Sequence, residues 1–260
     1  MSIHIILSLF DQSPAINQTS KTCLLTGASL GLGKHLAIEM VKRGWKVIGI
    51  ARREEKLKEV EQELGTLFIP YVCDVSKPEQ IHQVSEQIKQ RQLKPTLFFL
   101  NAASFDSSDK WQPMLSAHRQ TFDTNYFGVI AWVDEWINDL KKWGGGTFVV
   151  ISSINAIFAG SGSAGGGYGA SKAAVSSVFR SLRLRYYNDN IGFVDVLPGP
   201  IATQALGPKE KTQPFVHQPE DEARYIVEQV FKRKRHIEPS WYYSFKIRQL
   251  NLVPDKFLAK

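Results

Sequence analysis

The sequence predicts a single α/β domain in which helices cover both faces of a doubly wound parallel sheet, giving three layers. The chain has 260 residues, and 43% of them are hydrophobic, which is enough for one large buried core. Short apolar runs alternate with longer amphipathic segments, as in folds whose parallel strands are joined by helices. A glycine-rich turn joins the first such run to the first helical segment, which is typical of nucleotide-binding α/β domains.

That turn is the best defined part of the predicted sheet. Residues 22–25 form a short apolar run, residues 26–33 are rich in glycine, and a helical pattern then continues to Gly44. Glycines at such a turn let backbone N–H groups approach a pyrophosphate, and the start of the helix adds partial positive charge. The helix is expected to bury one apolar stripe, made of Leu36, Ala37, Met40 and Val41.

The next predicted strand, residues 46–50, bears on the choice of cofactor. NAD-binding folds usually carry a carboxylate at the end of this strand, where it holds the ribose 2′-hydroxyl. Here Ala51, Arg52 and Arg53 follow the strand. A carboxylate would repel a 2′-phosphate, whereas an arginine can bind it through paired N–H donors. We therefore predict NADP(H), with Arg52 as the main contact and Arg53 solvated.

The remaining elements continue the alternation. Helices are expected at residues 78–92, with a stripe of Ile81, Val84 and Ile88, at residues 170–187, and from Pro219 onward. Further strands are expected at residues 96–100, 147–151 and 192–197. Cys23 and Cys73 fall in predicted strands one and three with strand two between them, so we expect free thiols.

Tyr168 and Lys172 are the strongest candidates for chemistry. Residues four apart on a helix project from the same face. A phenol ordinarily holds its proton to a pKa of about 10, and a nearby ammonium group favours the phenolate. The pair can therefore act as a proton donor whose strength the protein adjusts.

Taken together, these motifs resemble the short-chain dehydrogenase/reductase family, in its branch of roughly 250 residues. The pattern Thr-Gly-x-x-x-Gly-x-Gly is met from Thr26 to Gly33, and the likeness extends to Thr203. The resemblance implies a Rossmann-type fold, a nicotinamide cofactor and a hydride-transfer reaction. It also implies the cofactor-binding residues Gly27, Ser29, Leu30, Gly31, Leu32, Gly33, Arg52, Asp74, Val75, Asn101, Tyr168, Lys172, Pro198, Gly199 and Thr203.

Two places depart from the family pattern. Ala103 stands where the family has glycine after Asn101, which adds a methyl group near the cofactor. The position that usually holds the catalytic serine is Asn155, and Ser153 precedes it by two residues. We interpret this as two extra residues in the loop 158–167, because loops absorb insertions at little cost. Ser153 is our prediction, and Ser152 is the alternative.

The resemblance implies an NADPH-dependent carbonyl reductase or alcohol dehydrogenase acting on a ketone, aldehyde or secondary alcohol. Tyr168 would donate the proton, Lys172 would lower the pKa of Tyr168 and bind the nicotinamide ribose, and Ser153 would stabilise the substrate oxygen. Asn125 would hold a water that links Lys172 to solvent. A non-catalytic NADP-binding sensor or scaffold on the same fold is the alternative. Epimerase or dehydratase chemistry is weaker, because the glycine spacing and the longer C-terminal domain of those relatives are absent.

The family likeness also implies a substrate lid at residues 199–217 and a homodimer or homotetramer formed through the helices that hold Asn125 and Tyr168. The lid is rich in apolar residues, which favours an adaptable pocket for a carbonyl compound. It does not distinguish among sugar, lipid, steroid and aromatic substrates.

The ends of the chain have other expected roles. Residues 1–20 form an extension before the domain at 21–260, and their apolar stretch, residues 3–10, is shorter than the about 20 residues that cross a bilayer. They also lack secretory-signal features, so we expect a cytoplasmic protein. The tail 237–260 mixes aromatic and basic residues. We expect Trp241, Phe245 and Leu252 to cover the substrate cleft or a subunit interface, with peripheral membrane contact as the less favoured alternative.

The net charge of +7 does not by itself indicate nucleic-acid binding. The clearest basic run, residues 232–235, is expected in the last turn of a helix, where positive charge complements the helix dipole. No nucleic-acid-binding motif accompanies it. The six histidines are scattered without the spacing of metal ligands, so we expect no metal site.

Overall fold

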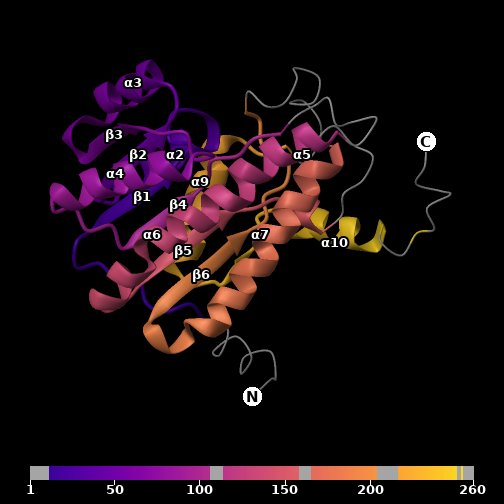
Figure 1. Ribbon diagram of the computed structural model, residues 1–260. Coiled ribbons are helices and arrows are strands. Elements are labelled where there is room, and N and C mark those ends of the chain that lie inside the picture. The colour runs from indigo at the N-terminus through magenta and orange to yellow at the C-terminus, as the bar shows by residue number, and fades with distance from the viewer. Residues whose placement is uncertain (1–11, 106–113, 158–164, 204–215, 251–252, 254–260) are drawn as a thin grey trace.

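The computed structural model describes residues 12–105, 114–157, 165–203, 216–250 and 253. Its centre is a seven-stranded parallel sheet with the order β3-β2-β1-β4-β5-β6-β7 (Figure 1). In chain order the strands are β1 (Thr22–Thr26), β2 (Lys46–Ala51), β3 (Phe68–Val72), β4 (Leu97–Leu100), β5 (Gly146–Ile151), β6 (Ile191–Val196) and β7 (His236–Ile237). The predicted three-layer α/β fold is confirmed.

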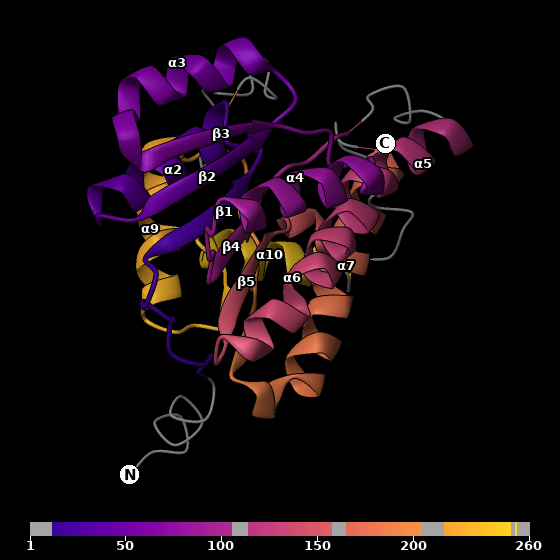
Figure 2. The ribbon, with the colours of Figure 1, turned by 60° about the vertical axis from the view of Figure 1, so that its left-hand side comes forward.

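Helices cover both faces of this sheet (Figures 1 and 2). The α-helices are α2 (Gly31–Lys42), α3 (Glu54–Leu64), α4 (Pro78–Gln90), α5 (Leu115–Phe122), α6 (Gly128–Lys142), α7 (Gly165–Arg185), α9 (Pro219–Phe231) and α10 (Trp241–Leu250). One buried cluster joins the sheet to α2, α3 and α9, and a second joins it to α4, α6 and α7. Short helical turns are η1 (Gly65–Leu67), η3 (Asp123–Phe127), η4 (Ile154–Ala156) and η5 (Tyr187–Asp189).

The order of the strands determines where a ligand can bind. β1 pairs with β2 on one side and with β4 on the other. The chain first runs outward from β1 through β2 to β3, and then returns to the other side of β1 to form β4, so the order of the strands reverses between β1 and β4. In parallel sheets, ligands bind beyond the carboxyl ends of the strands at such a switch point. Thr26 and Leu100 are register partners there, which brings the glycine-rich turn beside Asn101.

Most predicted elements are present with small shifts of their ends. The stripes of α2 and α4 face the core as expected, and Cys23 and Cys73 are buried free thiols. Cys73 directly follows β3 and is not inside the strand, which corrects that prediction.

The start of α7 differs from the predicted loop. Gly165, Gly166 and Gly167 form the first helical turn, while residues 158–164 lie outside the described residues. Glycine is a poor helix former, so no local signal announces this turn. The consequence is that Tyr168 lies near the beginning of the helix.

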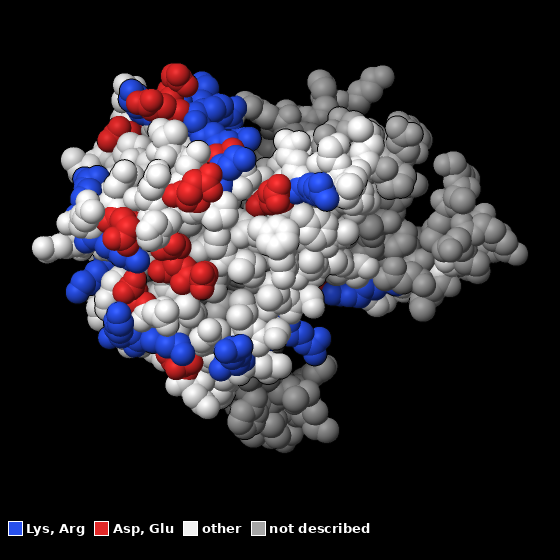
Figure 3. Space-filling model, viewed as in Figure 1, with Lys and Arg blue, Asp and Glu red and all other residues white. Residues whose placement is uncertain are grey.

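The basic run 232–235 is not helical, which corrects its predicted place. α9 ends at Phe231, and Arg233 has a positive φ of 64°. Arg233 and Arg235 donate side-chain hydrogen bonds to the backbone carbonyls of Ser13 and Gln12, each at 2.8 Å. These arginines therefore anchor the segment that precedes β1. On the face shown in Figure 3, acidic and basic residues are interspersed. Among the ion pairs of the described residues, Lys89 lies 4.0 Å from Glu135 and 3.4 Å from Asp139.

A chain of charged groups attaches the C-terminal segment to the sheet. Arg183 on α7 binds Asp195 on β6 at 2.7 Å, and Asp195 binds His236 at 2.8 Å. His236 also contacts Glu238, which pairs with Arg248 on α10. Hydrogen bonds that the imidazole of His236 donates to the carboxylates of Asp195 and Glu238 raise the pKa of His236 to about 9.

This raised pKa predicts a loss of stability at alkaline pH. The contribution of His236 is complete below its ordinary pKa of about 6.5 and is lost as the pH rises through about 9. Because 40% of the imidazole side chain is exposed, which screens the ion pairs, we expect only about 1 kcal/mol. Urea unfolding at pH 6 and pH 9.5 should show this loss for the wild-type protein relative to His236→Gln. A difference between the two proteins that does not change with pH would contradict the assignment.

Candidate active site

The glycine-rich turn has the geometry of a close approach between two backbones. Gly27 and Gly31 have φ of 70° and 54°, in the left-handed region that favours glycine. A Cβ on Gly33 would lie 2.0 Å from the carbonyl oxygen of Gly27. Only glycine at these positions lets the turn fold against the first turn of α2.

The first turn of α2 presents its backbone donors without competition from nearby side chains. Leu30 is the N-cap residue with an extended backbone and no side-chain cap hydrogen bond, and no acidic residue stands in the first turn. The N–H groups and the helix dipole are therefore available to an anion. Ser29 and Leu32 are buried beside the turn. These features fit the pyrophosphate of a dinucleotide.

The end of β2 provides the next part of the candidate nucleotide site. Arg52 is exposed, and its charge acts on Asp74, the residue predicted to lie beside the adenine. Burial opposes ionisation of Asp74, but hydrogen bonds from Ser76 and the charge of Arg52 lower its pKa. Val75, the other residue predicted there, is buried in the core.

Asn101 holds the glycine-rich turn in place. Its amide nitrogen donates to the carbonyl oxygens of Thr26 at 3.0 Å and Gly27 at 3.4 Å, and its backbone N–H donates to the Thr26 hydroxyl at 3.0 Å. Ala103, the departure from the family glycine, is exposed, so its methyl group does not press on the turn. The change at Ala103 leaves this support intact.

Ser153 and Tyr168 are brought together despite the longer loop between them. Ser153 follows the end of β5, and its side chain is hydrogen-bonded to Tyr168. Ser152, the alternative serine, instead donates to the backbone carbonyl of Lys172 at 3.0 Å and accepts from Ser176 at 2.8 Å. Ser152 therefore supports the helix, and the geometry favours Ser153 as the serine that meets a substrate.

Lys172 lies beneath Tyr168 in a nearly dry environment. Its ammonium nitrogen is 5.7 Å from the centroid of the tyrosine ring and donates to the carbonyl oxygen of Ile151 at 2.7 Å. Only 2% of Lys172 is exposed, and this burial lowers its pKa to about 7. Lys172 is therefore only partly charged at neutral pH.

The pKa of Tyr168 corrects an expectation. Lys172 was predicted to lower it, but burial raises it, with the hydrogen bond from Ser153 acting in the opposite direction. The reason is that the same burial removes water from the phenol and charge from the lysine. In the protein alone, Tyr168 holds its proton and can serve as an acid.

Asn125 occupies a turn of π-helix, η3, between α5 and α6. Such turns are frequent at functional sites. The amide of Asn125 accepts from the Ser104 N–H and donates to the Ser104 carbonyl oxygen, both at 2.8 Å, and also donates to the Ser171 hydroxyl at 3.0 Å. Ser171 in turn donates to the Tyr168 carbonyl oxygen at 2.7 Å. Asn125 thus links the segment after β4 to the turn of α7 that holds Tyr168.

The segment after β6 closes the other side of the site. The carbonyl oxygen of Pro198 accepts from the N–H of Ile154, just after Ser153. Gly199 follows, and the Thr203 side chain packs over Gly31: its Cγ2 lies 3.2 Å from the place of an added Cβ. Thr203 and the glycine-rich turn therefore share one wall.

Three neighbours of this site were not foreseen. Ser104 and Ser171 contact Asn125, and the ring of Phe105 packs edge-on against Tyr168 with centroids 6.2 Å apart. Ser171 stands beside Lys172 in the sequence, where its position could have suggested a structural role. Ser104 and Phe105 act through long-range contacts that no local pattern reports.

Comparison with known proteins identifies the family. The family model described as short chain dehydrogenase matches residues 21–214. The chain belongs to the short-chain dehydrogenase/reductase family. It is an oxidoreductase of a family that uses a nicotinamide cofactor and acts on CH–OH or C=O groups, as the sequence predicted.

Individual relatives agree with this assignment. The chain is 30% identical to an NADPH-dependent pterin aldehyde reductase of Arabidopsis thaliana, over 72% of this chain and 77% of that protein. It is 29% identical to 11-beta-hydroxysteroid dehydrogenase A of Sesamum indicum, over 92% of this chain and 73% of that protein. A short-chain dehydrogenase structure from Streptomyces avermitilis shares the fold, with a TM-score of 0.78, 22% identity, and coverage of 90% and 93% of the two chains.

The described part of the chain also bears on metal binding and on membrane spanning. Within it, no group of His, Cys, Asp and Glu side chains could hold a metal ion. Within the same residues, no helix has the length and hydrophobicity needed to cross a membrane.

Proposed function

We propose that this protein is an NADPH-dependent carbonyl reductase that also catalyses the reverse oxidation of a secondary or primary alcohol. The observation that carries the proposal is the contact between Ser153 and Tyr168, with Lys172 below the tyrosine ring and the glycine-rich turn across the switch point. This arrangement brings a proton donor, a second hydrogen-bond donor and a candidate nucleotide site together at one end of the sheet.

The roles of the side chains follow from this arrangement. When bound, NADPH supplies the hydride that adds to the carbonyl carbon. Tyr168 donates its proton to the carbonyl oxygen, so one hydride and one proton convert C=O into CH–OH. Ser153 donates a hydrogen bond to that oxygen and stabilises its developing negative charge. Lys172 supplies positive charge that assists reprotonation of the tyrosinate, and Asn125 keeps the turn that carries Tyr168 in register.

Support for NADP(H) over NAD(H) comes from the end of β2, where Arg52 is exposed and Ala51 takes the place of an acidic residue. The name of the Arabidopsis relative, NADPH-dependent pterin aldehyde reductase, agrees with this choice. The cofactor-binding residues proposed are those of the glycine-rich turn together with Arg52, Asp74, Val75, Asn101, Tyr168, Lys172, Pro198, Gly199 and Thr203.

Removing the side chain of Arg52 should reduce the preference for NADPH. We expect Arg52→Ala to raise the KM for NADPH about 10- to 100-fold, the loss of a hydrogen-bonded charge pair, and to leave the KM for NADH nearly unchanged. Arg53→Ala is the matched control, because Arg53 is also exposed but is the N-cap residue of α3. If the ratio of the KM for NADPH to the KM for NADH were the same in Arg52→Ala as in the wild-type protein, the assignment of Arg52 would be overturned.

The experiment that tests the proposed function measures NADPH oxidation in the presence of each member of a panel of ketones and aldehydes. The loss of the absorbance band of the reduced nicotinamide reports the reaction. Turnover of at least one carbonyl compound is expected. The alternative, a non-catalytic NADP-binding sensor or scaffold, predicts saturable NADPH binding without turnover of any member of the panel.

We also propose that the protein forms a homodimer or homotetramer through the surface around α5, η3 and α7. Leu115, Phe127 and Leu184 on these elements are 67%, 53% and 74% exposed. Large apolar side chains that stay exposed on these elements support an interface on this surface. The side chains of Trp241 and Leu252, expected over the cleft or an interface, lie outside the described residues, while Phe245 is 54% exposed.

A further inference from the structure

The backbone on either side of residues 204–215 is joined into a short paired segment, which we call the neck (residues 200–203 and 217). Ile201 and His217 form a parallel bridge. The N–H of Ala202 donates to the carbonyl oxygen of His217 at 2.9 Å, and the N–H of His217 donates to that of Pro200 at 3.0 Å. A shift of His217 would therefore move the whole neck.

The neck bears directly on the candidate nucleotide site. The N–H of Thr203 donates to the carbonyl oxygen of Ile201 at 2.7 Å, which forms a tight turn at the end of the neck. This turn places the Thr203 side chain over Gly31, with two of its carbon atoms 3.2 and 3.4 Å from where a Cβ of Gly31 would be. The location of Thr203 thus depends on where His217 is held.

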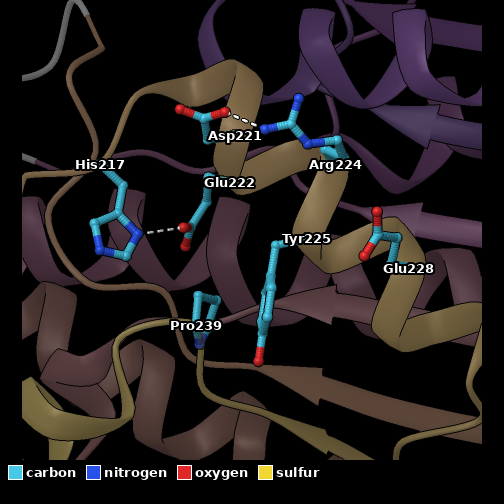
Figure 4. A pocket seen from close by; sticks show the side chains of 7 residues that line it. All are labelled: His217, Asp221, Glu222, Arg224, Tyr225, Glu228 and Pro239. Carbon is cyan, nitrogen blue, oxygen red and sulfur yellow. Dashed lines mark hydrogen bonds and ion pairs between the residues drawn. The ribbon is translucent and has the colours of Figure 1, made fainter.

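His217 is held by a carboxylate from α9 (Figure 4). Its Nδ1 lies 2.7 Å from Oε2 of Glu222, and its Nε2 lies 3.3 Å from the hydroxyl of Ser240, before α10. The two side chains point toward each other at one side of an open pocket of about 280 Å³, which Asp221, Arg224, Tyr225, Glu228 and Pro239 also line. Asp221 and Arg224 pair with each other at another side of the pocket.

The carboxyl group of Glu222 is buried at a position where an apolar side chain would be more stable. Only 1% of it is exposed, and its Oε1 has no hydrogen-bond partner among the residues that the structure describes. Burial raises the pKa of its carboxyl, and the bond with His217 offsets part of that effect. The adjoining core positions Ala223, Ile226 and Val227 are apolar. A buried carboxyl with one unsatisfied oxygen lowers the stability of the fold. Stability therefore does not explain Glu222, whereas its contact with His217 gives it a role in positioning.

We infer that Glu222 is a positioning residue: it fixes His217, and through the neck it fixes Thr203 over Gly31 in the cofactor site. This inference rests on the proposed function, which assigns Thr203 to the cofactor, and the family resemblance implies that this threonine meets the nicotinamide carboxamide. Glu222 acts on the reaction only through the neck. Its loss should therefore disturb hydride transfer more than the binding of the adenosine end, which other residues hold.

The test compares Glu222→Ala and Glu222→Gln with Val227→Ala, with Thr203→Ala and with the double variant Glu222→Ala/Thr203→Ala. Glutamine keeps an oxygen that can accept from His217. Val227 lies on the same helix and is fully buried, so its substitution lowers stability without touching the neck. The measurements are kcat, the KM for the carbonyl compound, the NADPH Kd, and the isotope effect with NADPH deuterated at nicotinamide C4.

We expect Glu222→Ala to lower kcat about 10- to 100-fold, the range for a reacting group misplaced by about 1 Å, with a larger isotope effect and an NADPH Kd within about 3-fold of wild type. Glu222→Gln should retain most of the activity, and Val227→Ala should retain the isotope effect of the wild-type protein. The double variant should be no slower than Thr203→Ala alone, because both changes remove the same contact.

Three results would overturn the inference while the proposed function stands: an unchanged kcat in Glu222→Ala, the same kinetic change in Val227→Ala, or losses that multiply in the double variant. A wild-type protein that oxidises NADPH with none of the carbonyl compounds would instead contradict the proposed function.

Discussion

Tyr168→Phe should abolish carbonyl reduction while leaving the protein folded and able to bind NADPH. The substitution removes one hydroxyl, and with it the proton that the carbonyl oxygen needs as the hydride arrives. A positioned general acid contributes about 10²- to 10⁴-fold, so we expect a loss of kcat/KM of at least that size. The phenol does not hold the fold: Tyr168 is partly buried, and its backbone carbonyl accepts the hydrogen bond from Ser171.

The measurement is steady-state NADPH oxidation with the best carbonyl substrate, together with NADPH binding by fluorescence. Tyr187→Phe is the matched control, because Tyr187 is 62% exposed on η5 and its ring faces Arg235 at the far end of α7. Near-normal turnover in Tyr168→Phe, with the control also active, would show that another group supplies the proton.

Lys172→Met should lose activity and gain stability at neutral pH. Methionine has a similar length and fills the buried space without an amine. Activity falls, by our expectation about 10²-fold or more, because no charge remains beneath Tyr168 to help restore its proton. Stability rises because the wild-type protein must bury an amine whose charged form is poorly solvated there.

The pH dependence of that gain follows from the lowered pKa of Lys172. In the folded protein its pKa is about 7, and in the unfolded chain it is the ordinary 10.5. Between these values the unfolded chain binds more protons, so the stability of the wild-type protein rises with pH across this window. Below pH 7 the full destabilisation from burying the charged amine of Lys172 is present. We expect Lys172→Met to be about 2 kcal/mol more stable there, after the loss of the hydrogen bond to Ile151 is included.

Urea unfolding at pH 6.5 and pH 10 measures this difference. The advantage of Lys172→Met should shrink toward pH 10 and reverse, because the neutral amine still donates to the Ile151 carbonyl oxygen. Lys141→Met is the control at an exposed lysine. A Lys172→Met protein that is less stable than wild type at pH 6.5 would mean that the buried amine contributes stability as a charged group.

The sequence predicted those parts of the molecule that depend on short-range patterns. The glycines of the first turn are needed because other residues cannot adopt the backbone angles of Gly27 and Gly31 or fit beside Gly33. The spacing of Tyr168 and Lys172 predicts a shared helix face. The alternation of apolar runs and helices predicts a parallel sheet, and the comparison with family members agrees.

Other properties depend on packing between distant residues and could not be read from the sequence. The pKa values of Tyr168 and Lys172 are set by burial, which no local pattern reports. The helical turn at Gly165 opposes the local preference of glycine. His217 and Glu222 are close in the sequence, but the importance of their contact appears only when the neck is seen to reach Gly31.

The measurement that tests the central claim most directly is a crystal structure with NADP⁺ and an alcohol or ketone inhibitor bound. We expect the hydroxyl groups of Tyr168 and Ser153 both to lie within hydrogen-bond distance of the ligand oxygen, on the side where nicotinamide C4 faces it. A complex in which the nicotinamide is ordered while the Tyr168 hydroxyl points away from the ligand would contradict the proposed chemistry.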